Sequence, residues 1–267
     1  MNATEQRRAP RLIGTLAAAF VTIATPMTIS AQAYATRSSV MAPVADVSGY
    51  RVAVGERAVY DVELKGRGIG KASLEILESE SVDGHAVVHG SLKLAGGILF
   101  AKVEEQFDSW FDPQRFVSRR FEQNQRELRR TRQRRYEITP ENGTFRETIS
   151  GDVDSLSTSE PLDDVSFLFY VRTLPLHVGD VDTIPRYFKP GREVVIRVLR
   201  KESVTVPAGT FQVIVVQPTI ANAGGLFGQG GRAEVYLTDD AARTLVMLRS
   251  HVPVLGSLAL TLREVAQ

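Results

Sequence analysis

The sequence predicts an all-β fold with one short helix, in which a large curved antiparallel sheet is rolled into a half-open barrel or β-roll. Two observations predict it. From Gly55 onward, about a dozen short runs rich in β-branched and aromatic residues alternate with turn-forming residues. Only residues 163–174 have apolar side chains at helical spacing. One rolled sheet plugged by the helix would bury this set of elements, and two packed sheets are the alternative.

The first 33 residues have the layout of a secretory signal peptide. Three arginines within residues 7–11 form a basic start, residues 12–24 are mostly apolar, and Ala31-Gln32-Ala33 is a small-x-small cleavage site. The apolar run is shorter than the roughly 20 residues that a membrane span needs. We therefore expect cleavage after Ala33, a periplasmic or secreted protein, and no transmembrane span after processing.

The rest of the chain divides into two parts. Residues 34–54 begin with a small, polar and aperiodic stretch, which predicts a flexible linker. Residues 55–267 are enough to bury a large core, and we expect them to form a single β domain. The chain has no cysteine, which excludes disulfides, thiolate metal sites and a cysteine nucleophile.

Turn signals separate the strands of the first half. Residues 65–70 form a glycine-rich reversal, and Asp83-Gly84 suits a two-residue hairpin. A further turn is expected at Gly96-Gly97, and Asp112-Pro113 closes the strand that follows. Together these signals predict consecutive antiparallel strands.

Residues 115–135 are strongly basic, with nine arginines and two glutamates. The chain after residue 33 holds 29 basic and 30 acidic side chains, so it is close to neutral as a whole, which argues against nucleic-acid binding. A helix over residues 122–135 would have one apolar residue and no face to bury. We therefore expect two strands that fold back near residues 124–126.

Strand alternation gives these arginines a common face. If Tyr136 and Ile138 point inward, Arg130, Arg132 and Arg134 share their side of the strand. Guanidinium groups there must meet carboxylates, water or an anionic ligand, because burying them without partners is too costly. Alternate residues lie about 7 Å apart, which suits successive phosphates or one branched anionic head group. We predict a ligand-binding face of Arg130, Arg132, Arg134 and Tyr136; a salt-bridged hairpin without a ligand is the alternative.

The second half begins with the predicted helix. Asp163 or Asp164 can cap the exposed amides at the start of residues 163–174, and Pro175 ends the helix. Its helical propensity is moderate, so burial of its apolar side chains must supply most of its stability.

A hairpin within residues 202–218 forms the centre of the predicted sheet. Pro207-Ala208-Gly209 reverses the chain, and Gly209 is expected to adopt backbone angles that other residues avoid. Residues 213–216 are all aliphatic and β-branched, which predicts a strand buried on both faces. The glycine-rich residues 221–231 are expected to form a loop. Three more strands are expected, at residues 232–238, 243–250 and 258–263.

Catalytic and metal-binding patterns are weak. His85 and His89 are four residues apart, which is about 13 Å along a strand and too far for one metal ion, so we expect exposed strand histidines. Asp163-Asp164 and Asp239-Asp240 fit helix caps and turns better than acid–base pairs. Trp110-Phe111 fits the core or its rim better than a ligand platform. We predict no catalytic residue, no metal site and no cofactor.

Short pieces spread over residues 55–267 form a recognisable pattern. They are Tyr60, Gly70-Lys71-Ala72-Ser73-Leu74, Phe107-Asp108, residues 166–172 (SFLFYVR), Gly179-Asp180, residues 206–211 (VPAGTF), Pro218, Leu237-Thr238-Asp239-Asp240 and Gly256-Ser257. In this order they resemble a family of exported bacterial proteins catalogued as domain of unknown function 3108. The resemblance implies an all-β extracytoplasmic fold and no established activity.

We expect a non-enzymatic binding protein of the cell envelope. The rolled sheet would hold an anionic amphiphile, such as a lipid or glycolipid, whose head meets the arginines. The alternative is a structural or assembly partner that docks on another envelope protein through exposed strand edges or the basic hairpin. A hydrolase that uses converging carboxylates is a third hypothesis.

Overall fold

The computed structural model describes residues 49–98, 101–127, 130–220, 233–252 and 256–266. The predicted signal peptide (residues 1–33), most of the predicted linker and the glycine-rich residues 221–231 lie outside this part of the chain. Within it, no helix is long and apolar enough to cross a membrane. The strands are β1 Arg57–Leu64, β2 Arg67–Val82, β3 His85–Ile98, β4 Ala101–Phe111, β5 Ser118–Glu127, β6 Arg130–Thr139, β7 Thr144–Glu147, β8 Val153–Ser155, β9 Val181–Ile184, β10 Val194–Val206, β11 Gly209–Ile220, β12 Glu234–Thr238, β13 Leu245–Val252 and β14 Gly256–Ala266.

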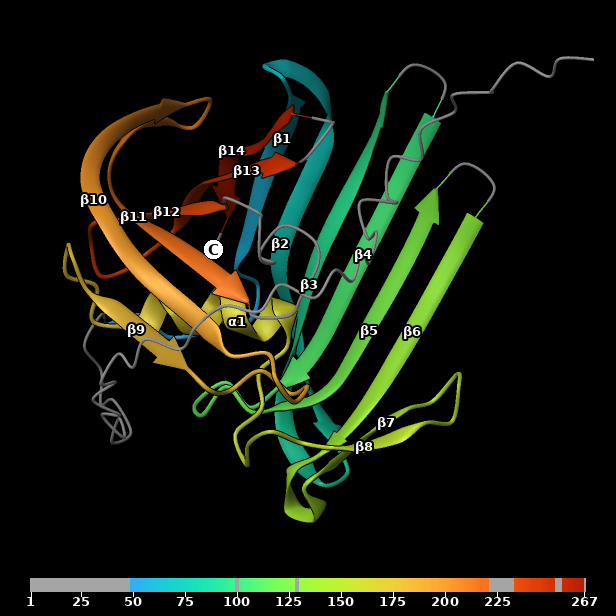
Figure 1. Ribbon diagram of the computed structural model, residues 1–267. Helices are drawn as coiled ribbons and strands as arrows, with labels where there is room; N and C mark the ends of the chain where they lie inside the picture. Colours follow the sequence, from blue (N-terminus) through green and yellow to red (C-terminus); the bar gives the residue numbers. More distant parts are fainter. Residues whose placement is uncertain (1–48, 99–100, 128–129, 221–232, 253–255, 267) are drawn as a thin grey trace, which may run out of the picture.

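All these strands belong to one antiparallel sheet (Figure 1). Its order is β8-β7-β6-β5-β4-β3-β2-β1-β14-β13-β12-β11-β10-β9, so neighbours in sequence are neighbours in space and β14 pairs with β1. The two ends, β8 and β9, do not pair with each other, and the sheet stays open. The predicted all-β class and half-open barrel are confirmed, and one sheet rather than two is found.

Most hairpin turns lie where the sequence predicts them. The β1–β2 turn is formed by Lys65 and Gly66, with φ of 50° and 73°. Asp83 and Gly84 join β2 to β3 with φ of 50° and 81°, which is the pair of positive angles that a two-residue hairpin needs. Gly143 follows the short 3₁₀ turn η1, Pro140–Asn142, in the left-handed region.

The predicted turn at Gly96-Gly97 is wrong, because both glycines lie inside β3. Gly96 pairs with Gly70 of β2, and the two backbones approach closely there. A Cβ atom on Gly70 would lie 2.2 Å from the carbonyl oxygen of Ala95, and one on Gly96 would lie 2.7 Å from that of Ile69. These glycines therefore permit close strand contact instead of a reversal.

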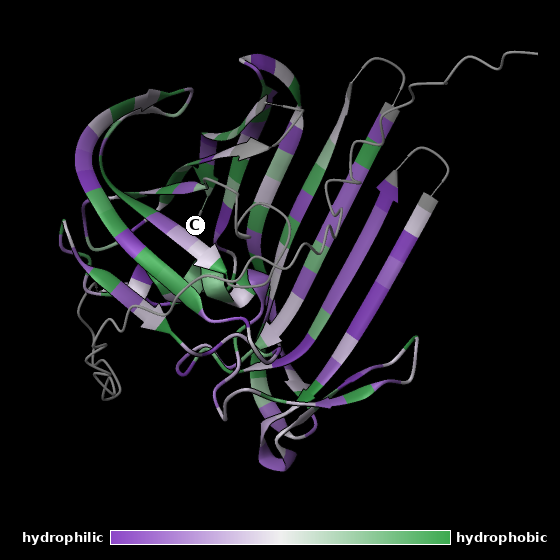
Figure 2. Cartoon of the chain, in the orientation of Figure 1, coloured by the Kyte–Doolittle hydropathy of each residue, from purple (hydrophilic) through white to green (hydrophobic). Residues whose placement is uncertain are grey.

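The predicted reversal near residues 124–126 is also wrong. β5 continues to Glu127, and Asn124 and Arg126 pair with Gln133 and Thr131 of β6. β6 begins at Arg130, and residues 128–129 between the two strands lie outside the described residues. Polar residues can form these strands because β5 and β6 are not fully buried. Figure 2 shows β5 and β6 as largely hydrophilic, whereas β10 and β11 carry longer hydrophobic stretches.

The central hairpin is confirmed. β10 and β11 pair from Val194–Ile220 to Val206–Gly209, and Gly209 has a φ of 133°. Residues 213–216 of β11 are 0% exposed, so both faces of this strand are covered, as predicted. Burial of this run is a large favourable contribution to folding, since each fully buried aliphatic side chain contributes roughly 1.5–3 kcal/mol.

The helix α1, Asp164–Tyr170, continues into the 3₁₀ turn η2, Val171–Thr173. Asp163 caps it by accepting hydrogen bonds from the amides of Val165 and Ser166, while the Ser166 hydroxyl accepts from the Asp163 amide. Its apolar side packs on β3 and β4 at Gly90, where a Cβ atom would lie 3.0 Å from the Phe111 ring. We call this side of the sheet the inner face.

An aromatic cluster ties the two ends of the sheet together beside α1. Phe188, between β9 and β10, packs against Phe121 of β5, Tyr136 of β6 and Phe145 of β7, with ring centroids 5.1–6.1 Å apart. Tyr187 extends this cluster, 5.2 Å from Phe188. The barrel is therefore held at this level by side chains where strand pairing is absent.

Candidate anion-binding site

β6 carries the four residues that the sequence predicts to bind a ligand. Tyr136 and Ile138 are 3% and 2% exposed and face the core. Strand alternation places Arg134 and Arg132 on the same inner face, where Arg134 is half-buried and Arg132 is exposed. Arg130 is the first residue of β6, and its backbone pairs with Glu127. The shared face is what the sequence predicts, and the ligand-binding role stays a prediction.

The inner face changes from apolar to polar along β5. Phe121 pairs with Tyr136 next to α1, then Gln123 lies opposite Arg134, and Gln125 lies opposite Arg132. Neutral amides, rather than carboxylates, are therefore the cross-strand neighbours of both arginines.

The adjoining strands supply apolar residues to the same face. Phe107 of β4 pairs with Gln123, and Leu92 of β3 pairs with Phe107. Leu94 follows two residues further along β3, opposite Glu105. Leu92, Leu94 and Phe107 pack only partly against the core and keep part of their surface exposed. A partly buried apolar strip thus lies on the same face as the arginines of β6, two to three strands away.

Two cations from a distant part of the sequence join Arg134. Lys189, just after the aromatic cluster, donates a 2.8 Å hydrogen bond from Nζ to the Tyr136 hydroxyl, and its Nζ lies 4.1 Å from the Tyr136 ring centroid. Burial and, after it, the positive charges of Arg192 and Arg134 together lower the pKa of Lys189 to about 8. Three cationic side chains are therefore close enough to repel one another.

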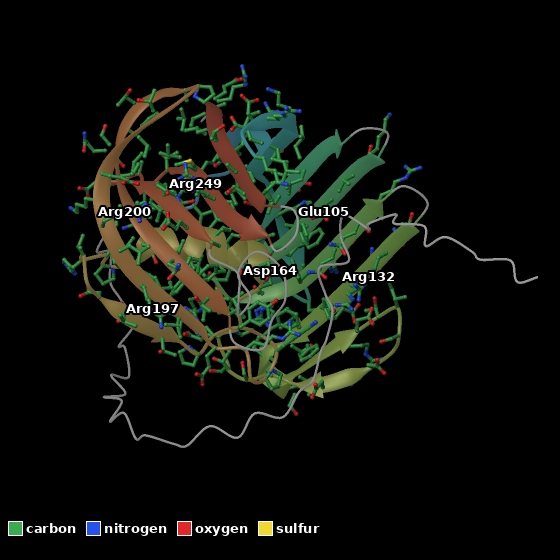
Figure 3. The ribbon with its side chains drawn as sticks, turned by 45° about the horizontal axis from the view of Figure 1, so that its top comes forward. Glu105, Arg132, Asp164, Arg197, Arg200 and Arg249 are labelled. Atoms are coloured by element: carbon green, nitrogen blue, oxygen red, sulfur yellow. The ribbon has the colours of Figure 1, made fainter. Side chains whose placement is uncertain are left out.

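Asp164 is the carboxylate nearest to this group. It is the first residue of α1, and Figure 3 labels it together with Arg132 and Glu105, which come from β6 and β4. The Tyr187 hydroxyl donates to its Oδ1 at 3.1 Å, and Gln123 Nε2 donates to its Oδ2 at 3.3 Å. Burial raises the pKa of Asp164, although Lys189 and Arg192 attract its charged form. Its hydrogen-bonding capacity is already largely used by neutral groups.

The charges on this face do not balance. Within the described residues, no carboxylate oxygen lies within 4.0 Å of a side-chain nitrogen of Arg132, Arg134, Lys189 or Arg192. Other arginines of the basic segment are paired: Arg135 with Glu122 at 2.8 Å, and Arg119 with Glu141 at 2.6 Å. We call Arg132, Arg134, Lys189 and Arg192 the cation cluster. None of its four members forms an ion pair with a carboxylate of the described residues.

The sequence predicts two of the four members of the cation cluster. Arg132 and Arg134 stand out through their alternation with Tyr136, but Lys189 and Arg192 are single basic residues in an ordinary loop. They reach the site because Phe188 inserts between β5, β6 and β7. The one hint in the sequence is Tyr136, whose hydroxyl can accept a hydrogen bond from a cation such as Lys189.

The other sequence motifs have structural roles, as predicted. Asp163 is a helix cap, and its pKa is raised by burial to about 6. Asp240 accepts hydrogen bonds from the amides of Ala242 and Arg243 in the β12–β13 turn. Trp110 and Phe111 are 8% and 0% exposed and belong to the core.

An open antiparallel sheet, curled around a short helix and carrying cations on its inner face, defines this chain as a half-open β-barrel protein. It belongs to the family described as protein of unknown function DUF3108, whose model matches residues 59–263. The resemblance noted in the sequence is thereby confirmed. No curated protein matches the chain.

Solved structures align with this chain to different extents. A β-barrel-like protein of the DUF1849 family from Brucella abortus aligns with a TM-score of 0.50 and 11% identity over 80% of this chain and 98% of that one. A protein provisionally described as exported, from Bacteroides fragilis, aligns at 0.31 with 10% identity over 82% and 98%. One provisionally described as a lipoprotein, from Parabacteroides distasonis, aligns at 0.35 with 12% identity over 84% and 100%.

Proposed function

We propose that this protein is a non-enzymatic binding protein of the cell envelope that holds an anionic amphiphile. The anionic head lies against the cation cluster, and the apolar chain lies along Leu92, Leu94 and Phe107. The observation that carries the proposal is the cation cluster itself: four positive side chains on the inner face without a carboxylate partner among the described residues, on the same face as a partly buried apolar strip.

Electrostatics supports an anionic ligand. Arg134 and Arg192 lower the pKa of Lys189, which means that their charges destabilise its charged form. A phosphate or carboxylate placed among them would offset that repulsion. Guanidinium groups are suited to this because their planar fork binds such oxyanions in a bidentate way.

The apolar strip supports an amphiphile rather than a free inorganic anion. The accessible part of these leucine and phenylalanine side chains gains free energy when a hydrocarbon chain covers it, at about 25 cal/mol per Å² of apolar surface. Leu92, Leu94 and Phe107 lie on the inner face, two to three strands away from the arginines of β6. A ligand with a charged end and an apolar end fits both surfaces at once.

The cell-envelope location belongs to the same proposal. It is supported by the signal-peptide layout of residues 1–33. Mass spectrometry of the exported protein should give the mass of residues 34–267. A mass that includes residues 1–33 would contradict cleavage after Ala33.

Vesicle binding tests the ligand class. The purified protein should bind phosphatidylglycerol vesicles, lose that binding as salt rises, and bind phosphatidylcholine vesicles weakly. Arg132→Gln with Arg134→Gln should reduce binding at least about tenfold, because two charge-assisted contacts are lost. The matched control is Arg135→Gln, on the same strand but paired with Glu122.

The comparison of these variants decides the proposal. Equal losses in both variants would mean that net charge alone drives binding. No salt-sensitive binding by the parent protein, to vesicles or to envelope glycolipids, would also contradict the proposal. Circular dichroism spectra that match the parent would establish that the variants fold.

A second function, docking on another envelope protein, has one observation in its favour. The edge strands β8 and β9 expose Val153 and Val181, which are 55% and 60% accessible. Exposed edges can pair with a strand of a partner. Val153→Lys with Val181→Lys should then abolish co-purification of that partner while vesicle binding persists; retained co-purification would exclude these edges.

A further inference from the structure

A second group of titratable side chains lies on the side of the sheet opposite to α1. Gly90 of β3 faces the helix, so its neighbour His89 points away from it. Glu78 and Glu80 of β2 lie beside His89, and one ligand atom from each of the three residues lies within 4.8 Å of the others. None of these residues belongs to the cation cluster.

His89 is held in one orientation by its neighbours. Its Nε2 lies 3.1 Å from Oδ1 of Asp108, whose side chain is 6% exposed, and Gln106 binds the other Asp108 oxygen at 2.7 Å. The imidazole stacks on Trp110, with ring centroids 4.3 Å apart. The prediction of an exposed histidine is wrong for His89, whose side chain is 14% exposed. The fixed ring directs Nδ1 toward Glu80.

Glu80 is held as firmly as His89. Trp110 Nε1 donates a 2.9 Å hydrogen bond to Glu80 Oε1, and the same oxygen lies 3.5 Å from His89 Nδ1. Glu78 lies in a bulge of β2, where the register against β3 shifts between Ile76 and Ser79. Bulges are frequent beside functional sites because they redirect side chains. Here the bulge leaves Glu78 exposed and able to turn toward the other two residues.

We propose that Glu78, Glu80 and His89 form a binding site for a divalent cation of the zinc class. In this site Asp108 accepts a hydrogen bond from the Nε2–H of His89, and in that tautomer the Nδ1 lone pair faces the Glu80 carboxylate. A cation between Nδ1 and Oε1 replaces that repulsion by two bonds. Ligand atoms at about 2.0 Å from tetrahedral zinc are about 3.3 Å apart, close to the 3.5 Å found here.

The surroundings resemble the support that zinc ligands have in proteins. A ligating histidine usually donates its other ring N–H to a carboxylate, which fixes the ring and makes it more basic. Asp108 takes that place for His89, and Trp110 orients Glu80. Three protein ligands leave the fourth position to water on the exposed side of Glu78.

Trp110 gives this site its own optical signal, because it is the only tryptophan of the chain and stacks on His89. Titration of the metal-free protein with Zn²⁺ should change its fluorescence in a saturable way, with calorimetry giving one ion per chain. His89→Gln should abolish this binding. Asp108→Asn should weaken it by about 10–100-fold, since it changes only the group that supports the ligand.

Two further variants keep the proposal falsifiable. Glu78→Gln changes an exposed side chain, so the fold should persist while Zn²⁺ affinity falls at least about tenfold. His85→Gln is the matched control, because His85 is exposed on the same strand and contacts Arg119 and Glu141 instead. Parent-like binding by both Glu78→Gln and His89→Gln, or no saturable binding by the parent protein, would overturn the proposal.

Discussion

Arg172 and the arginines of β6 place the same guanidinium group in opposite surroundings. Arg172, in η2, is 3% exposed. It donates to Glu56 at 2.5 Å, to the Tyr50 hydroxyl at 3.0 Å and to the Ala242 carbonyl at 2.9 Å, and it lies 3.6 Å from the Tyr50 ring centroid. Arg132 is exposed and has no carboxylate partner among the described residues.

The difference separates architecture from function. Arg172 joins the helical segment to the chain before β1 and to the β12–β13 turn, so its partners lie 70 to 122 residues away in sequence. Both of its terminal nitrogens have protein partners, and only the buried Nε lacks one. The cation cluster has no carboxylate partner among the described residues. The first arrangement stabilises the fold, and the second is suited to an anion.

The largest expected effect is the loss of the paired arginine. Arg172→Ala should reduce the free energy of unfolding by about 3–5 kcal/mol, because Glu56 is left without its partner in a largely buried place. Denaturant unfolding measures this. Arg135→Ala, which breaks an exposed pair, should cost no more than about 1 kcal/mol. Similar losses of unfolding free energy in the two variants would contradict the claim that Arg172 stabilises the fold more than an exposed, paired arginine does.

Replacing Arg132 and Arg134 should have the opposite effect: stability should change little, and anion binding should fall. Arg132→Gln with Arg134→Gln should lower the free energy of unfolding by no more than about 1 kcal/mol, because Arg132 is exposed, Arg134 is half-buried and neither has a carboxylate partner among the described residues. Anionic vesicle binding should nevertheless fall at least about tenfold. A marked loss of stability would show that these arginines have internal partners and serve the fold.

The pH dependence of binding sharpens the role of Lys189. Because its pKa is lowered to about 8, it loses its proton in the folded protein between about pH 7 and pH 9, and anion affinity should fall over that range. The unfolded chain keeps the proton up to its ordinary pKa of 10.5, so the Lys189 contribution to stability rises with pH above 8.

Phosphatidylglycerol vesicles suit this measurement, because their charge is constant over that range. Lys189→Arg is the control, since an arginine stays charged and should flatten the pH profile. A profile that is the same in the parent and in Lys189→Arg would exclude Lys189 from the site.

The smallest change converts an unpaired arginine into a paired one. Gln125 lies opposite Arg132, so Gln125→Glu gives that arginine a cross-strand carboxylate. We expect anionic vesicle binding to weaken, while stability changes by less than about 1 kcal/mol, because the pair with Arg132 is offset by Glu105, which lies opposite residue 125 on β4. Stronger or unchanged binding would indicate that Arg132 does not meet the ligand.

The sequence predicts those parts of the fold that depend on local chemistry. Asp83-Gly84 and Pro207-Ala208-Gly209 lie at turns because their residues favour the backbone angles of a reversal. Asp163 caps α1 because its carboxylate satisfies free amides. Glycine alone is ambiguous: Gly96 serves close packing against Gly70, and only the pairing of β2 with β3 distinguishes this from a turn.

The candidate sites depend on contacts between distant segments, which sequence patterns do not contain. Strand alternation places Arg132 and Arg134 together, but Lys189 reaches them only through the packing of Phe188. The spacing along β3 relates His89 only to His85, whereas the side chains that contact His89 come from β2 and β4. Which residues come together at the two sites therefore depends on contacts between segments, such as the register between strands, and not on spacing within one strand.

Native mass spectrometry of the protein purified from its own cell envelope tests the central claim most directly. We predict that the parent protein carries a bound anionic amphiphile, seen as a discrete added mass that organic extraction releases. The variant with Arg132→Gln and Arg134→Gln should lack this mass, and Arg135→Gln should retain it. A parent protein whose mass is that of its polypeptide alone, or a ligand retained equally by all three proteins, would contradict the account.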